Sequence, residues 1–399
     1  MNQPSALRPG REIPPGQRLV RSLRRRPRLR AGLIQIAYVA GAVGAALLAA
    51  EIESGPQVNA ARTSNLLFAV GGGIISLVAV VFSLLFLTVQ FASTTLSPRL
   101  NLFRDEPLVW HAFGLFVGVF VFSTTAALRT STQDEMSVVI PTATIVLALA
   151  AMAVARNLQM SAFSSVQVGP TVQEITHRGR AVIDQLYEPL TAGDAAPSTP
   201  TKASEEVRWL GDDGYIRQVD VQRLFDSAVR RHGTIQLPLR PGQYVRHGDV
   251  VFRLSFDPSD TETEDLLRHI EIGPDRTWEQ DPLLAFRLLV DIGLRAQSPA
   301  INDPATCRHT IDAVSGLLRY VADRHLTIGD ITDPNGGARL VLRPVTWEDY
   351  VAAAVDELIE AGRGSASVAA RLVEVLRDLT TAVPADRRGE IRQRLQRLD

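Results

Sequence analysis

Arginine, aspartate and hydroxyl side chains recur at regular spacing in the stretch 281–306, which holds the strongest candidates for chemistry in this chain. Arg287, Asp291 and Arg295 are four residues apart, so a helix would present them on one face. The other faces of that helix are largely apolar, so we expect this charged stripe to meet another element or another subunit. On an exposed surface the same stripe would be an ion-pair ladder worth about 0.3–0.5 kcal/mol per pair.

The second half of the stretch has the residue types of a helix N-terminus. Asp303 is followed by proline, the order expected for an N-cap and the first helical residue. The free N–H groups at such an end suit an anion, but the Asp303 carboxylate would oppose one and favour a cation or an arginine. We therefore expect Arg287 or Arg295 to reach Asp303, and the alternative is a capped turn without a ligand. The ligand or coupling candidates of the whole stretch are Arg287, Asp291, Arg295, Ser298, Asn302, Asp303 and Thr306.

Two more candidates, Ser97 and Arg99, close an apolar run earlier in the chain. The proline between them stops a helix. Arg99 can then bond a lipid phosphate, or instead an acidic residue of the soluble part such as Asp291. Both alternatives place the pair where a membrane segment ends.

No motif for catalysis, metal binding or cofactor binding occurs in the sequence. It lacks a Walker loop, an HExxH or CxxC motif and a GxSxG nucleophile elbow. Its one cysteine, Cys307, can form neither a disulfide within a monomer nor a thiolate metal cluster, and its seven histidines are scattered. We therefore expect no cofactor, no metal site and no catalytic residue, which makes an enzyme less favoured without excluding one.

The elements that must position these residues include four long apolar runs. None of the four runs contains Asp, Glu, Lys or Arg. Each has about 20 residues, and at about 1.5 Å per residue that length crosses the roughly 30 Å of a bilayer's hydrocarbon. The sequence therefore predicts an α-helical membrane protein with four transmembrane helices within residues 31–156. The four runs are residues 31–50, 66–89, 108–128 and 136–154.

Arginine placement predicts the orientation of these runs. Residues 1–30 carry nine arginines and one glutamate, a local charge of +8, directly before the first run. Such a segment could bind nucleic acid, but before an apolar run it is typical of the cytoplasmic side, and we expect no nucleic acid partner. Arg99 and Arg104 after the second run, and Arg156 after the fourth, agree with this orientation. We expect a multi-pass protein of the bacterial cytoplasmic (inner) membrane with both termini in the cytoplasm.

The absence of acidic side chains from the runs argues against proton-coupled transport, which usually needs buried acids or bases. Four spans also leave little room for a path through one chain, so a conduit would form between subunits. Gly114 and Gly118 form a GxxxG motif that lets helices pack closely. Hydroxyls would line the conduit, and the alternative is that each bonds a carbonyl of its own helix. The hydroxyl residues concerned are Ser76, Ser83, Thr88, Ser123 and Thr124.

After the fourth run the pattern predicts a mixed α+β, mainly helical, cytosolic domain. Residues 157–205 indicate a helix and a linker, residues 206–256 a small α+β unit, and residues 257–399 a helical domain. Within the last of these, a helix is predicted to start directly after Asp281. The apolar face of the following helix places Cys307 in the core.

Several short phrases give the chain a family resemblance. The longest and most specific is Leu289–Arg295 with Ser298–Thr306. The others are Gln90-Phe91-Ala92-Ser93 with Ser97-Pro98-Arg99, and the pairs Gly214-Tyr215, Pro241-Gly242, Ile272-Gly273 and Arg276-Thr277.

Together these phrases resemble the bacterial predicted-membrane-protein family catalogued as domain of unknown function 2254, from the first apolar run to residue 325. The resemblance implies a four-span inner-membrane protein with a cytosolic domain, and it implies no established activity. Gln297 and Ala300 depart from the pattern, in which Leu and Gly are expected. A Gly at position 300 would allow a positive φ, which Ala300 does not favour.

Two functional hypotheses follow. The first is an oligomeric channel or transport-like protein regulated by its cytosolic domain. The alternative is a non-transporting membrane scaffold or sensor that recruits cytosolic partners, and a membrane enzyme is a third, weaker reading. The expected partners are the lipid bilayer, further copies of the chain, and a cytosolic protein or a small ligand.

Overall fold

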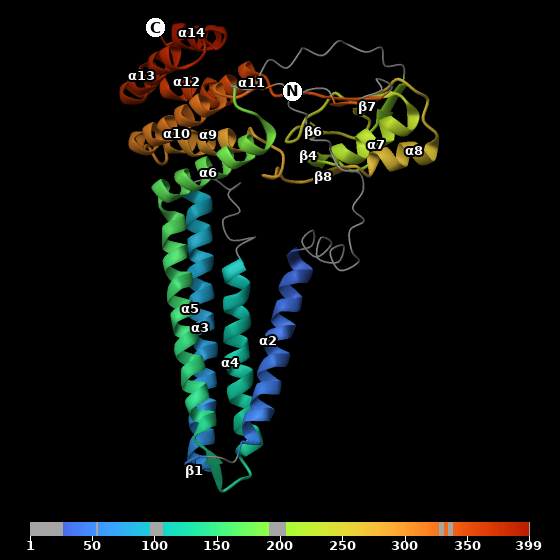
Figure 1. Cartoon of the computed structure of the whole chain (residues 1–399). Helices are drawn as coiled ribbons and strands as arrows, with labels where there is room; N and C mark the ends of the chain where they lie inside the picture. Colours follow the sequence, from blue (N-terminus) through green and yellow to red (C-terminus); the bar gives the residue numbers. More distant parts are fainter. Residues whose placement is uncertain are drawn as a thin grey trace, which may run out of the picture. The chain divides into compact units, whose positions relative to one another are not determined.

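The computed structural model describes residues 27–52, 55–95, 107–190, 205–326, 331–333 and 338–398. These residues belong to two compact units (Figure 1). The first unit contains long apolar helices, and the second contains the chain from residue 167 onward.

Four helices of the first unit are long and apolar enough to cross a membrane, which confirms the predicted runs. The helix α3 has 36 residues, which corresponds to about 54 Å of axial length. It is therefore longer than the roughly 30 Å hydrocarbon layer that its apolar run was expected to cross. The four helices are α2 (Pro27–Ala50), α3 (Ala60–Thr95), α4 (Pro107–Thr130) and α5 (Val139–Val166).

Two short strands join the connections at one end of this unit (Figure 1). The strand β1 (Gln57–Asn59), between α2 and α3, pairs antiparallel with β2 (Glu135–Ser137), between α4 and α5. The Ala60 amide also donates to the Asp134 carbonyl at 3.1 Å. The α2–α3 and α4–α5 connections therefore lie at the same end, and the helices alternate in direction.

Small residues of α4 allow α2 to pack closely against it. A Cβ built at Gly114 would lie 2.5 Å from Cδ2 of Tyr38, and Gly118 lies against the Tyr38 backbone. The Tyr38 hydroxyl is 3.4 Å from Nδ1 of His111. The GxxxG motif therefore accommodates an aromatic ring of the neighbouring helix.

Hydroxyls of the spans bond their own helices in three of the five predicted positions. Ser76 donates to Gly72 O at 3.0 Å, Thr88 to Leu84 O at 2.8 Å and Ser123 to Val119 O at 2.8 Å. This is the alternative reading of those residues. Ser123 is nevertheless buried, whereas Ser76 and Ser83 lie on the exposed side of α3.

Helices form most of the second unit. The face predicted to bury Cys307 is confirmed, since Cys307, Ile311 and Val314 are each no more than 2% exposed. One of the helices contains a π-helical segment, η1 (Ala352–Asp356), between α11 and α12. The helices are α6 (Val168–Leu186), α9 (Leu284–Ala296), α10 (Pro304–Ala322), α11 (Trp347–Val351), α12 (Glu357–Gly362), α13 (Ala366–Ala382) and α14 (Arg388–Gln396).

Two sheets and two short helices complete the second unit. The larger sheet has the order β3-β7-β5-β10-β9 and the smaller the order β6-β4-β8. Alternation of buried and half-buried residues along β5 is the pattern of a strand with one buried face. The elements are β3 (Glu205–Arg208), β4 (Gly214–Val219), α7 (Val221–Arg231), β5 (Thr234–Leu237), β6 (Tyr244–Val245), β7 (Val250–Leu254), α8 (Asp260–Leu267), β8 (Ile270–Gly273), β9 (Ile331–Thr332) and β10 (Arg339–Leu342).

The predicted helical region 257–399 also supplies strands, which corrects the expectation that it is only helical. The strand β8 pairs with β4, and β10 pairs in parallel with β5 through Leu340 opposite Ile235. Both strands have four residues, too few for a periodicity to distinguish them from a loop. Their partners are far away in the sequence, so both strands join their sheets through tertiary pairing.

Candidate functional site

The sequence-derived candidates are concentrated on α9, on α10 and on the turn between them. Ser97 and Arg99 lie outside the described residues. The helix α9 begins at Leu284 rather than directly after Asp281, and it carries Arg287, Asp291 and Arg295.

The charged stripe of α9 does meet another element. Arg287 Nη2 lies 2.6 Å from Asp291 Oδ1, and Nη1 of the same guanidinium pairs with Glu357 of α12. Burial alone would lower the pKa of Arg287, but the two carboxylates outweigh it and raise that pKa. The side chains of Arg287 and Asp291 are only 30% and 14% exposed, so the stripe joins two helices of the same chain.

Asp303 caps α10 and has different partners from those predicted. Its Oδ1 accepts from the amides of Ala305 and Thr306, both at 3.1 Å, and Oδ2 accepts from the Thr306 hydroxyl at 2.5 Å. These bonds, above all that of the Thr306 hydroxyl, lower the pKa of Asp303. The predicted pairing with Arg287 is wrong, since that guanidinium binds Asp291 and Glu357. The protein's own carboxylate thus occupies the place that an anion would take.

Asn302 provides the positive φ in the turn. Its φ is 46°, in the left-handed region that Asn tolerates better than most residues. Its amide donates to Ser298 O at 2.8 Å, and the Ser298 hydroxyl donates to Arg295 O at 2.7 Å. Ala300 has no positive φ, so the turn closes without the glycine expected there.

Asp281 is more than the helix start that its sequence indicates. Only 2% of the residue is exposed, and its carboxylate accepts from Arg276 Nε at 2.6 Å and Nη2 at 2.9 Å. Burial raises the pKa of Asp281, and the Arg276 guanidinium opposes that shift. The bidentate geometry fixes the orientation of the carboxylate as well as its charge.

Gly242 lies directly against this carboxylate. A Cβ at position 242 would overlap the Asp281 oxygens, and the φ of Gly242 is +82°. Glycine alone meets both conditions without strain. The sequence showed a Pro-Gly turn here, but nothing local to the turn indicated the buried acid beneath it.

A second ion pair and two tyrosines surround the same place. Arg240 Nη1 lies 2.5 Å from Asp349 Oδ2, and the buried Tyr350 hydroxyl donates to that of Tyr187 at 3.1 Å. Burial raises the pKa of both tyrosines. For Asp349, burial acts in the same sense, but Arg240 and Thr346 outweigh it and lower the pKa. We name the Asp281 junction as the residues Tyr187, Arg240, Gly242, Arg276, Asp281, Asp349 and Tyr350.

Family-resemblance motifs of the second unit converge on this junction. The pairing of β4 with β8 sets Tyr215 opposite Gly273, and the Gly242 amide donates to the Ile216 carbonyl at 2.8 Å. The Thr277 hydroxyl donates to Arg217 O at 3.4 Å. Residue pairs that are scattered in the sequence therefore form one continuous support for Arg276 and its carboxylate partner.

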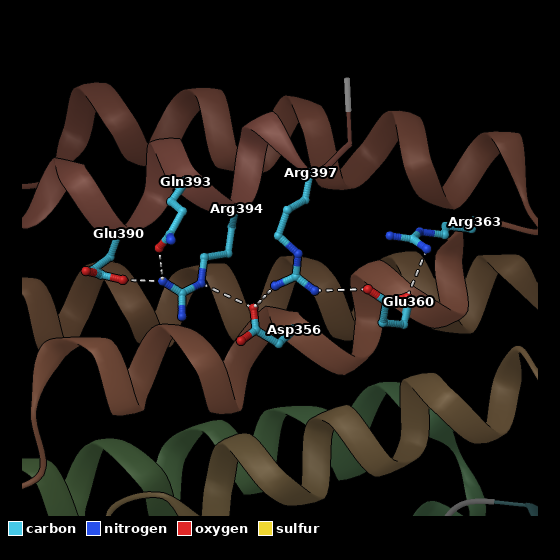
Figure 2. Close-up of polar contacts among 7 residues, drawn as sticks. All are labelled: Asp356, Glu360, Arg363, Glu390, Gln393, Arg394 and Arg397. Atoms are coloured by element: carbon cyan, nitrogen blue, oxygen red, sulfur yellow. Dashed lines mark hydrogen bonds and ion pairs between the residues drawn. The ribbon is translucent and has the colours of Figure 1, made fainter.

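A separate charged network ties the C-terminal helix to η1 and α12, as Figure 2 shows. Asp356 of η1 accepts from Arg394 Nε at 3.2 Å and from Arg397 Nη1 at 2.9 Å. Arg397 also donates to Glu360 at 2.9 Å, and Arg394 pairs with Glu390. The charges of this network compensate one another, so it braces α14 and offers no unpaired group for a ligand.

Metal-binding groups do not assemble in the described part of the chain. No cluster of three His, Cys, Asp or Glu side chains with metal-binding geometry occurs among the described residues. Burial raises the pKa of the Cys307 thiol to about 11, so this thiol is a poor nucleophile at neutral pH. The geometry is suited to joining elements by charge, and the Asp281 junction is the candidate functional site.

Comparisons with known proteins identify relatives without a described activity. The chain is 29% identical over 276 residues to the uncharacterized proteins Mb1321c of Mycobacterium bovis and Rv1290c of Mycobacterium tuberculosis. The match covers 66% of this chain and 53% of each relative, so it spans about half the length of those proteins. No solved structure matches the chain. A family model described as "Predicted membrane protein (DUF2254)" matches residues 30–378, and the chain therefore belongs to that family.

Proposed function

We propose that this membrane protein is an oligomeric channel or transport-like protein that its second unit regulates. The support comes from where the first unit has its polar groups. The interior between its helices is formed by apolar side chains such as Ile74, Phe116 and Leu158. The buried hydroxyls Ser123 and Thr144 donate to carbonyls of their own helices. A single copy thus has little with which to line a polar path, and the path is assigned to the space between copies.

The exposed side of α3 is the surface at which copies would meet. Six small or polar residues follow one another there at alternating steps of four and three, the spacing of one helix face. Hydrocarbon offers their polar groups no hydrogen-bond partner, whereas small residues let a second helix approach closely. A Cβ at Gly72 would have nothing within 4 Å, so there is room for that approach. The six residues are Asn65, Ala69, Gly72, Ser76, Ala79 and Ser83.

Reconstitution of the full chain into liposomes tests this proposal. Ser76→Val with Ser83→Val is expected to lower ion flux and leave the oligomer intact, because only the lining changes. Gly72→Leu is expected to reduce both the oligomer, measured by mass photometry, and the flux. Leu84→Val is the matched control, since Leu84 is 38% exposed on the same helix and is not three or four residues from any residue of this face. A monomer without flux would rule the proposal out.

The proposal places the protein in the bacterial cytoplasmic membrane with both termini inside. It is supported by the arginine-rich residues 1–30 and by the pairing of β1 with β2, which brings the two arginine-poor connections to one end. Thr132→Cys on that end and Arg392→Cys on the second unit can be labelled with a membrane-impermeant maleimide. Only the first should react in intact cells. Native Cys307 is buried and should stay silent in both.

The alternative is a non-transporting scaffold or sensor that recruits cytosolic partners. It is favoured by the hydrogen bonds of span hydroxyls to carbonyls of their own helices. Hydroxyls bonded in this way do not line a path, as expected for helices that only anchor the protein in the membrane. It predicts no flux, together with a cytosolic partner that is lost when residues 281–306 are altered and membrane insertion is intact. Flux from the reconstituted protein would decide against it.

A further inference from the structure

A cavity of about 360 Å³ lies in the second unit, beside the end of α10. We propose that it binds a short-chain carboxylate through the guanidinium of Arg324, and, resting on the proposed function, that this ligand regulates the protein. Its volume is at the small end of the range for ligand pockets, so a short-chain carboxylate fits inside it. The lining residues are Pro189, Leu190, Tyr320, Asp323 and Arg324.

Two chain segments frame the cavity and hold each other. The Leu190 amide donates to Asp323 O at 3.1 Å, and the His325 amide donates to Glu188 O at 2.8 Å. Pro189 and Arg324 form an antiparallel bridge between them. The frame is therefore fixed by backbone hydrogen bonds, which makes the cavity a built feature of the fold.

Arg324 has hydrogen-bonding capacity to spare. Its Nη2 donates to Asp184 Oδ1 at 2.6 Å, and its guanidinium lies 4.6 Å from the centre of the Tyr320 ring. Its Nε is buried and has no hydrogen-bond partner among the described residues. Buried donors without partners are rare in native structures and cost free energy. A carboxylate that reached Nε from the cavity would satisfy that donor and leave the Nη2 bond to Asp184 in place.

The acidic side chains nearest Arg324 are offset by basic or hydroxyl groups. Asp184 is compensated, because it accepts from both Arg324 and the Tyr320 hydroxyl. The charge of Asp323 acts on the buried guanidinium of Arg387, which itself donates to the Arg324 carbonyl. A further guanidinium, that of Arg180, lies 5.1 Å from the Tyr320 ring centre. A carboxylate matches the fork of a guanidinium, and Pro189 and Leu190 provide an apolar wall for a short aliphatic chain.

The position of the cavity links it to regulation. Pro189 comes two residues after Tyr187, the residue of the Asp281 junction that directly follows α6. The helix α6 in turn follows α5 after one residue, so the frame is continuous in sequence with the fourth apolar helix. A ligand that tightens the contact between residues 189–190 and α10 would change how the end of α6 is held.

Butyrate is the probe that tests the binding, with the full chain in detergent micelles at constant ionic strength. Sodium butyrate is expected to raise the unfolding temperature saturably, and 1-butanol, which lacks the charge, is expected not to. Arg324→Gln should abolish the shift. Arg319→Gln, at an exposed position of α10 five residues earlier in the chain, should retain it. Leu190→Trp fills the cavity from a side chain that is 40% exposed, so it should block binding in a folded protein.

Three results would overturn the proposal. They are a butyrate effect no larger than that of sodium chloride, a saturable effect that persists in both Arg324→Gln and Leu190→Trp, and saturation by inorganic phosphate but not by butyrate. Binding is measured here without flux, so failure of the channel proposal leaves this result standing. Liposome flux with and without butyrate then tests the regulation, and a flux that butyrate does not change would limit the site to binding.

Discussion

Asp281 and Asp303 of the second unit are each followed by proline, yet they have different fates. Asp303 caps α10 with its carboxylate and stays near the surface, and its pKa is lowered. Asp281 is 2% exposed, is bound to Arg276 and supports a glycine turn from another part of the chain, and its pKa is raised. The difference teaches that tertiary neighbours, and not the local Asp-Pro motif, decide what each aspartate does.

Gly242→Ala should have the largest effect of the changes that test this contrast. The left-handed φ costs an alanine about 1–2 kcal/mol, and overlap with the Asp281 carboxylate adds about 1–3 kcal/mol. Urea unfolding of the full chain in detergent measures the sum. Gly248→Ala is the matched control, since its φ is +89° and a Cβ there meets nothing within 4 Å. Equal losses in the two variants would mean that Asp281 does not constrain the turn.

Asp281→Ala should destabilise the protein by about 3 kcal/mol, because it leaves a largely buried arginine without its partner. The lower part of the range for broken buried pairs applies, since the Arg276 side chain keeps 23% exposure to water. The same unfolding measurement checks it. Arg276→Met combined with Asp281→Ala should recover part of the loss, and no recovery would argue against the ion pair as the cause.

Asp303→Ala should cost about 1 kcal/mol, the usual loss of an N-cap. The remaining N–H groups at the start of α10 can turn to water, so no charge is left buried. Asp303→Ser, which can still accept from the amide of Thr306, should lose less. A loss as large as that of Asp281→Ala would erase the contrast between the two residues.

The pH dependence of the two positions should have opposite sign. The lowered pKa of Asp303 means that its stabilisation is present above its unfolded pKa and is lost as pH falls through the folded value. The raised pKa of Asp281 means that its contribution grows more favourable as pH falls and weakens as pH rises through the folded value. Unfolding of the Asp281→Asn and Asp303→Asn variants between neutral and acidic pH, compared with the parent chain, measures both slopes.

The smallest expected effect is on the rate at which the Cys307 thiol is labelled. This rate reports which substitution exposes the core around α10. The thiol is fully buried, and burial raises its pKa to about 11, so a thiol reagent should label it slowly in the parent chain. Labelling should stay slow in Asp303→Ala and become faster in Asp281→Ala. Equal rates in both variants would show that α10 opens independently of the junction.

Local information in the sequence predicted a large part of this fold. The apolar runs found the four long helices, and periodicity placed Cys307 inside. The Asp303 cap also followed from two adjacent residues. In each case the deciding interaction lies within one element or between sequence neighbours, and residue spacing reports such interactions directly.

The candidate site was harder to predict, because its partners are remote. Arg240 and Asp349 are 109 residues apart in the chain, and no local spacing links them. The strand β10 pairs with β5, but the pattern of its four residues does not indicate which strand is its partner. Asp281 was read as a helix start, since nothing beside it in the sequence announces the turn that covers it. A single sequence shows the charges but not their pairing.

The π-helical segment η1 has a consequence for how insertions and deletions act on this chain. A π-bulge corresponds to one residue inserted into an α-helix, which rotates everything after it by about 100°. Asp349 and Tyr350 before η1 serve the Asp281 junction, and Asp356 at its end accepts from Arg394 and Arg397 near the C-terminus. Deleting Ala353 would restore ordinary helical phase and leave one of those two sets facing the wrong way. The extra residue thus rotates the second half of the helix relative to the first, so that each half presents its side chains to a different set of partners.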